Sequence, residues 1–122
     1  MILTISLLGD AGTVPKQYWL FKQETHISLG RGADNNIVLS DRIVSRRHLE
    51  LKKTEHGWQL MNLGVNGTYV NDVLIDSYFL RGAEIIGLTS LDPRLLVQLS
   101  SVPFATLVKA TNRHHSPLLS LS

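Results

Sequence analysis

Hydrophobic and polar residues alternate along the first segment of the chain. Leu3, Ile5 and Leu7 are separated by Thr4 and Ser6. Because successive side chains on a strand point to opposite faces, this pattern predicts a strand with one buried face. Similar alternation, or a short apolar run, recurs at residues 18–21, 27–29, 37–39, 49–52, 58–60, 69–70, 73–75, 85–86 and 95–99. The chain is therefore predicted to contain many short strands.

Turn-forming residues separate these segments. Gly9-Asp10-Ala11-Gly12, Asp34-Asn35-Asn36 and Glu55-His56-Gly57 each fall between two predicted strands, and such clusters are typical of tight turns. Asn66-Gly67 also matches the residue preference of a type I′ hairpin turn. Short strands with a turn signal every roughly 8–12 residues, without helical periodicity before residue 90, predict an all-β fold, an antiparallel β-sandwich.

The C-terminal part contains one ambiguity and one change of character. Asp92-Pro93 could begin a helix, with Asp as the N-cap and Pro at the first helical position. We favour a strand for residues 95–99 because every other element is predicted to be one. Beyond this strand the apolar residues lose their period, and Ser, Thr, His and Pro become more frequent. We expect one domain over residues 1–100 and a C-terminal extension over 101–122, flexible over 109–122.

Length and composition are those of an ordinary globular domain. The 122 residues are 43% hydrophobic and 18% charged, which is enough for one hydrophobic core. The net charge is +2 and the pI is near 9.2, but the only tight basic cluster is Arg42, Arg46 and Arg47. This cluster is too short to follow a nucleic-acid backbone, so nucleic acid is not expected as a partner.

The sequence carries no sign of secretion or of a membrane span. The apolar start of the chain lacks the basic residues and cleavage pattern of a signal peptide. No apolar run approaches the roughly 20 residues that a transmembrane helix needs. The absence of cysteine excludes disulfides and fits a reducing compartment. We expect a soluble, cytoplasmic protein without a membrane partner.

Catalysis has little support in the sequence. The acidic residues are scattered, no histidine lies in a nucleophile-and-acid pattern, and no glycine-rich phosphate loop opens a helix. His114-His115 is the only pair that resembles a metal site, and it lacks a third ligand. We expect neither an enzyme, nor a cofactor, nor a small-molecule substrate.

Three short motifs carry the candidate chemistry. Gly30-Arg31, Ser45-Arg46-Arg47-His48 and Asn66-Gly67-Thr68 each lie where a strand pattern gives way to a loop. Arginine binds two phosphate oxygens at once, and serine and asparagine supply further hydrogen-bond donors. Adjacent residues on an extended chain point opposite ways, so only one of Arg46 and Arg47 is expected to face a ligand, and we favour Arg46. Together the motifs predict a site for a phosphorylated peptide.

These motifs and the sequence between them resemble the forkhead-associated (FHA) domain. The similarity extends from about Ile27 to Ile75 and continues weakly through Leu80-x-Gly82. The matching stretches between the motifs are Asp34-Asn35-Asn36-Ile37-Val38-Leu39, Val44-Ser45-Arg46-Arg47-His48-Leu49-Glu50-Leu51 and Gly67-Thr68-Tyr69-Val70-Asn71. The resemblance implies an eleven-stranded β-sandwich whose loops at one end bind phosphothreonine peptides in Ser/Thr kinase signalling.

The resemblance also implies a role for each motif residue. The residues expected to contact the phosphopeptide are Arg31, Ser45, Arg46, Val65 and Asn66, and those expected to shape the loops are Gly30, His48 and Gly67. Among them, Asn66 would hydrogen-bond the peptide main chain, and His48 would brace the loops without touching the ligand. A small apolar pocket for the threonine methyl group is also implied.

Val65 departs from the family pattern. The family usually has a hydroxyl residue directly before Asn-Gly, whereas this chain has valine in a stretch that is one residue shorter. Two interpretations follow. The domain binds a threonine-phosphorylated protein or peptide, or it is an FHA-like scaffold that binds a protein partner without phosphate dependence.

Overall fold

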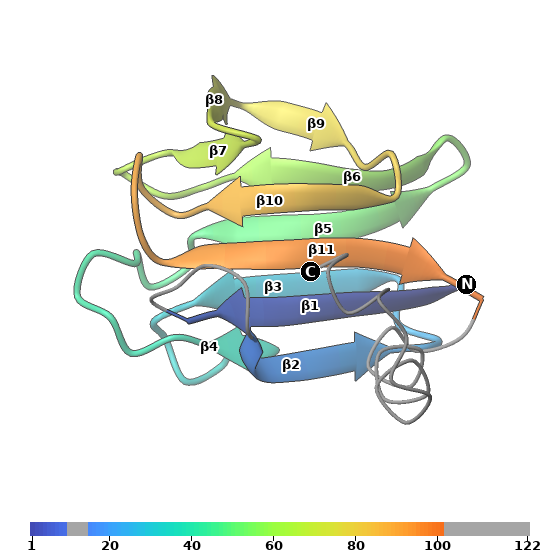
Figure 1. Ribbon diagram of the computed structural model, residues 1–122, viewed down its shortest axis with the longest axis horizontal. Helices are drawn as coiled ribbons and strands as arrows, with labels where there is room; N and C mark the ends of the chain where they lie inside the picture. Colours follow the sequence, from blue (N-terminus) through green and yellow to red (C-terminus); the bar gives the residue numbers. More distant parts are fainter. Residues whose placement is uncertain (10–14, 102–122) are drawn as a thin grey trace, which may run out of the picture.

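Eleven strands form two facing sheets in the part of the chain that the structure, a computed structural model, describes, which is residues 1–9 and 15–101 (Figure 1). The strands are β1 (Ile2–Leu8), β2 (Pro15–Phe21), β3 (His26–Gly30), β4 (Ile37–Val38), β5 (Leu49–Thr54), β6 (Gly57–Asn62), β7 (Thr68–Val70), β8 (Val73–Ile75), β9 (Ser77–Phe79), β10 (Ala83–Gly87) and β11 (Arg94–Ser100). No helix is present among these residues.

The first sheet has six strands in the order β2-β1-β11-β10-β7-β8, and the second has five in the order β4-β3-β5-β6-β9. Neighbouring strands are antiparallel throughout, except that β3 and β4 are parallel. The predicted antiparallel β-sandwich is therefore confirmed. Residues 95–99 lie in a strand and not in a helix, as the sequence analysis favoured.

The alternating apolar positions of both sheets meet in one core. Leu3 and Ile5 of β1 and Ile27 and Leu29 of β3 are at most 1% exposed. Among the described residues, the buried apolar side chains are Leu3, Ile5, Ile27, Leu29, Ile37, Leu39, Val44, Leu49, Leu51, Trp58, Leu60, Val70, Ile86, Leu88, Leu95 and Val97. Full burial of one such side chain stabilises the fold by roughly 1.5–3 kcal/mol, so the core holds the sheets together.

Three loops gather at one end of the sandwich, at the left of Figure 1. They connect β3 to β4, β4 to β5 and β6 to β7. Each loop carries one of the three sequence motifs, so the fold brings together residues that are up to about 35 positions apart in the chain. The loop between β9 and β10 lies at the opposite end.

Two details of the sequence analysis need correction. Strand β9 (Ser77–Phe79) was not among the predicted elements. Asn66-Gly67 is not a type I′ hairpin turn, because that turn needs a positive φ at both residues and only Gly67 has one, at 84°. The two-residue turn of this kind is Asn71-Asp72, with φ of 48° and 70°, and it joins β7 to β8. The expected extension over residues 101–122, including His114-His115, lies outside the described residues except for Ser101.

The Asn71-Asp72 turn generates a stability prediction. Asp72 adopts a left-handed conformation that glycine tolerates better, by roughly 1 kcal/mol. Its ion pair with Arg94, at 3.7 Å, is largely exposed and contributes little. Asp72→Gly is therefore expected to raise the free energy of unfolding in a urea titration, and Asp72→Ala to lower it. Both variants lose the ion pair, so equal destabilisation by both would show that the ion pair dominates.

Candidate functional site

The first two loops of the site are joined by their backbones. The Arg31 N–H donates to the Ser45 carbonyl and the Gly32 N–H donates to the Arg46 carbonyl, each at 2.9 Å. Gly30 is required at the start of this contact, because a Cβ there would lie 2.1 Å from the Arg46 carbonyl oxygen. The close approach places Arg31 beside Ser45 and Arg46, although they are far apart in the sequence.

Asn35 adds a second link between the same loops. Its side-chain Nδ2 donates to the Gly32 carbonyl at 2.8 Å and to the Arg46 carbonyl at 2.7 Å, and the residue is only 7% exposed. Sequence reasoning assigned Asn35 to a turn and did not include it in the site. The Asp34-Asn35-Asn36 run was the available signal, but nothing in it distinguishes a turn residue from a buried crosslink.

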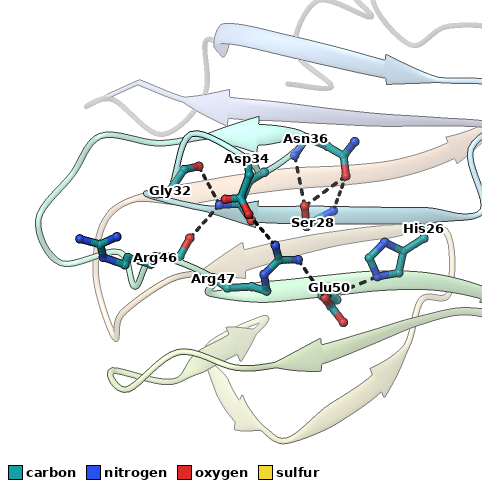
Figure 2. A network of polar contacts seen from close by, with 9 residues as sticks. His26, Ser28, Gly32, Asp34, Asn36, Arg46, Arg47 and Glu50 are labelled. Carbon is teal, nitrogen blue, oxygen red and sulfur yellow. Dashed lines mark hydrogen bonds and ion pairs between the residues drawn. The ribbon is translucent and has the colours of Figure 1, made fainter.

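The three arginines of the site have different partners. The Arg31 Nε donates to the Val44 carbonyl at 3.0 Å, which fixes the side chain, and neither Nη group has a partner within the part of the chain that the structure describes. Arg47 forms ion pairs with Asp34 at 3.1 Å and with Glu50 at 3.3 Å (Figure 2). The exposed Arg46 side chain makes no hydrogen bond or ion pair with the described residues. Of these three, the available cations are therefore Arg31 and Arg46.

His48 connects the second loop to the third. The Ser45 N–H donates to His48 Nδ1 at 3.1 Å, and His48 Nε2 lies 2.8 Å from the Gly67 carbonyl oxygen. Since Nδ1 accepts a hydrogen bond, the ring proton of the neutral imidazole belongs on Nε2, which donates to Gly67. The ring thus spans the two loops that carry Ser45 and Asn66.

The burial of His48 affects its pKa. His48 is 0% exposed, and a Cβ on Gly64 would lie 2.6 Å from its ring. Burial lowers the pKa of His48 below the ordinary value of 6.5, and the Gly67 carbonyl opposes this by a smaller amount. A proton added at Nδ1 would also face the Ser45 N–H donor, so the geometry is suited to the neutral ring.

The third loop presents its side chains to solvent. The Gly67 N–H donates to the Gly64 carbonyl at 3.2 Å, which closes a turn with Val65 and Asn66 at its tip. The Val65 N–H donates to Ser45 Oγ at 3.1 Å, and Asn66 Nδ2 donates to the Ile43 carbonyl at 2.8 Å. The Val65 side chain is 94% exposed. The Ser45 hydroxyl proton and the side-chain carbonyl oxygen of Asn66 have no hydrogen-bond partner among the described residues.

Two further polar residues, Asn62 and Thr68, stabilise this loop through hydrogen bonds. Asn62 Oδ1 accepts hydrogen bonds from the Gly64 N–H at 3.0 Å and from the Thr68 hydroxyl at 2.7 Å. Thr68 is 0% exposed. Thr68 was part of a sequence motif, but its role as a buried support was not predicted, because the sequence alone does not place it opposite Asn62.

The arrangement is a rigid frame with polar groups at its surface. Gly30, His48 and Gly67 lie within the frame, whereas Arg31, Arg46 and Asn66 are exposed and Ser45 is half-buried. Two cations and a hydroxyl at one end of a sandwich are suited to an anionic ligand. No group of three or more His, Asp or Glu residues that could hold a metal ion occurs within residues 1–9 and 15–101. The same residues contain no helix able to cross a membrane.

Comparison with protein families identifies this architecture. The family model of the FHA domain matches residues 27–88, which contain all three loops of the site. The chain belongs to the FHA domain family.

Several known proteins are similar to this chain. The glycogen accumulation regulator GarA of Mycolicibacterium smegmatis is 41% identical over 58 residues, which cover 47% of this chain and 37% of that protein. The ABC transporter ATP-binding/permease protein Rv1747 of Mycobacterium tuberculosis is 31% identical over 67 residues, or 54% of this chain and 8% of that protein. The chain thus spans well under half the length of these relatives.

Solved structures share the fold. An FHA domain from a study of phosphothreonine-dependent FHA interactions has a TM-score of 0.70 and 27% identity, covering 84% of this chain and all of that one. The FhaA FHA domain in complex with the intracellular domain of Rv3910 has a TM-score of 0.65 and 29% identity, covering 79% of this chain and 99% of that one.

The buried His48 predicts a pH-dependent stability. Its folded-state pKa lies below 6.5, so the unfolded chain takes up the proton more readily as the pH falls through that value. The contribution of His48 to the free energy of unfolding is therefore fully present above pH 6.5, and it decreases as the pH falls toward the folded-state pKa. Urea unfolding midpoints measured from about pH 8 to about pH 5 should show this decrease.

The control separates His48 from the exposed histidines. The double variant His26→Asn/His56→Asn is expected to keep the decrease, whereas His48→Asn is expected to be less stable throughout and to lose it. The same decrease in His48→Asn would assign the effect to other groups.

Proposed function

We propose that this domain binds a phosphorylated threonine on a partner protein and thereby mediates a phosphorylation-dependent protein–protein interaction. The ligand is a peptide segment presented to the three loops. Arg31, Ser45 and Arg46 bind the phosphate, and Asn66 binds the peptide main chain. The domain acts as an interaction module and not as an enzyme.

One observation carries the proposal. Arg31 is held by its Nε on the Val44 carbonyl, while its Nη donors, the Arg46 guanidinium and the Ser45 hydroxyl proton have no partner among the described residues. Arg47, by contrast, is neutralised by Asp34 and Glu50. A cation that is held in place like Arg31, with free donors, binds phosphate without first breaking an internal ion pair.

The similar structures support the same chemistry. EmbR of Mycobacterium tuberculosis, with a TM-score of 0.66 and 25% identity, was solved with a phosphopeptide. FhaA was solved with the intracellular domain of another protein. Both ligands are proteins or peptides.

A second function is favoured by Val65. This side chain lies at the tip of the third loop, is 94% exposed, and has no hydroxyl to offer a phosphate. An exposed apolar side chain at the tip of a binding loop is suited to contact a protein surface. The second candidate is therefore a scaffold that binds its partner without phosphate.

Arg31→Ala tests the main proposal. A hydrogen bond to a charged group contributes roughly 1.5–3 kcal/mol, which corresponds to a loss of roughly 10-fold to 150-fold in phosphopeptide affinity. The measurement is calorimetric titration with a phosphothreonine peptide that binds the original domain, beside its unphosphorylated copy. Arg81→Ala, which removes an exposed arginine from the opposite end, is the matched control and should bind normally. If the phosphopeptide affinity of Arg31→Ala stayed within twofold of that of the original domain, Arg31 would not be part of the binding site.

A serine-for-threonine exchange in the ligand tests the threonine preference. Burying one methyl group contributes roughly 0.8 kcal/mol, and up to about 3 kcal/mol with tight packing. A phosphothreonine peptide is therefore expected to bind a few-fold to about a hundredfold more tightly than its phosphoserine counterpart. Competition by fluorescence polarisation measures the ratio, and equal binding would point to a purely electrostatic contact.

Val65→Thr tests the missing hydroxyl. Because the side chain is 94% exposed, threonine adds a donor at the loop tip without placing a hydroxyl in the core. Phosphopeptide affinity is expected to rise by a factor corresponding to about 1 kcal/mol, with an unchanged melting temperature. Val65→Ala is the control for the loss of apolar surface. A Val65→Thr variant that binds no better than the original would place this position outside the phosphate contact.

A further inference from the structure

Every carboxylate in the first two loops of the site and in the following strand β5 is held by a donor of the domain itself. These acidic residues are Asp34, Asp41 and Glu50. Asp41 Oδ1 accepts a hydrogen bond from the Ile43 N–H at 3.0 Å. The carboxylates of Asp34 and Glu50 both form ion pairs with Arg47.

The arginines of the same part of the chain are used in two different ways. Arg31, Arg42 and Arg46 form no ion pair with the described residues, whereas Arg47 forms two. Arg31 and Arg46 are the cations of the proposed phosphate site. One arginine therefore takes up the two carboxylates that its neighbours leave unpaired.

Asp34 lies close to the backbone of both proposed phosphate-binding arginines. It follows Arg31 by three residues. A Cβ on Gly32, the residue directly after Arg31, would lie 3.1 Å from Asp34 Oδ1 and 3.2 Å from the Arg46 carbonyl oxygen. The Asp34 side chain is 78% exposed, and its Oδ1 has no hydrogen-bond partner within residues 1–9 and 15–101. A negative charge with one free oxygen is thus present at the edge of a site for an anion.

Arg47 holds this carboxylate through its planar guanidinium. Its Nη2 lies 3.1 Å from Asp34 Oδ2, and its Nη1 lies 3.3 Å from Glu50 Oε2. Glu50 also lies 3.5 Å from His26 Nε2. Figure 2 shows the side chains of Arg46 and Arg47 pointing in opposite directions. The fork of an arginine pairs with two carboxylates at once, and here it leaves Arg46 out of the network.

We propose that Arg47 is a positioning residue for the phosphate site, which holds Asp34 in an ion pair and so prevents this carboxylate from pairing with Arg31 or Arg46. The inference rests on the proposed function of the three loops. A phosphate that approaches an arginine already paired with a carboxylate has to displace that carboxylate, and the two negative charges repel each other. Arg47 acts through Asp34 and does not touch the ligand.

The exposure of the ion pair indicates that it affects binding more than folding. The side chains of Arg47 and Asp34 are 41% and 78% exposed, and exposed ion pairs contribute little to stability. The first loop is already fixed by the backbone hydrogen bonds of Arg31 and Gly32 and by the Asn35 side chain. Loss of Arg47 is therefore expected to lower phosphopeptide affinity and to leave the melting temperature almost unchanged.

A double-variant cycle on the full chain tests this role, with calorimetric titration of a phosphothreonine peptide that binds the original domain. Arg47→Gln is expected to weaken binding about threefold to tenfold, with a change in melting temperature below about 4 °C. Asp34→Asn is expected to bind at least as tightly as the original domain. The double variant Asp34→Asn/Arg47→Gln should regain an affinity within about twofold of the original, because the competing carboxylate is gone.

Two results of this cycle would overturn the inference. One is an equal loss of affinity on Arg47→Gln with and without the Asp34 carboxylate, because Arg47 would then act by its own charge or through the fold. The other is an equal loss in the matched control Arg94→Gln, which removes a cation and an exposed ion pair with Asp72, at 3.7 Å, outside the three loops. This control is expected to bind normally.

A measurement without ligand separates this inference from the proposed function. In ¹H–¹⁵N spectra of the free domain, Arg47→Gln is expected to shift the Nε–H signal of Arg31 or Arg46, and the double variant is expected to return it toward its original position. A shift that persists in the double variant would overturn the role of Arg47 alone. Failure of the original domain to bind any phosphothreonine peptide would overturn the proposed function, and this inference with it.

Discussion

The ring of His48 makes two hydrogen bonds, and the candidate site depends on both. One is received from the Ser45 N–H and the other is donated to the Gly67 carbonyl. Because the ring is completely buried against Gly64, neither bond competes with water. A buried donor or acceptor left without its partner costs roughly 1–3 kcal/mol, so the two loops are held in one relative position.

This constraint separates the groups that form the frame from the groups that bind. Backbone contacts of Arg31 and Gly32, the Asn35 crosslink and the Asn62 bonds use polar atoms internally and leave few of them for a ligand. The Arg31 and Arg46 cations and the Ser45 hydroxyl proton remain available at the surface. A frame that is fixed before binding reduces the entropy lost when a ligand is held, which favours the proposed binding of a phosphorylated residue.

The sequence predicted the architecture because the strands obey a period of two and the motifs lie at their ends. The motifs that carry the similarity, Gly30-Arg31, Ser45 to His48 and Asn66-Gly67, lie on three neighbouring loops, and the binding roles assigned to their residues stay predictions. The sequence did not reveal Asn35 or Thr68 as buried supports, since their partners are carbonyl and amide groups of residues that only the fold brings near. Strand β9 was missed because it has only three residues, two of them exposed, which is too short a segment to show an alternating pattern.

The protonation state of His48 in the free protein tests the central claim most directly. In ¹⁵N-labelled protein near neutral pH, long-range ¹H–¹⁵N spectra of the imidazole report which ring nitrogen carries the proton. Our account predicts a neutral ring with the proton on Nε2, and an unprotonated Nδ1 that accepts from the Ser45 N–H. A proton on Nδ1, or a charged ring at that pH, would contradict it, because Nδ1 could then no longer accept from Ser45 and the link between the two loops would be lost.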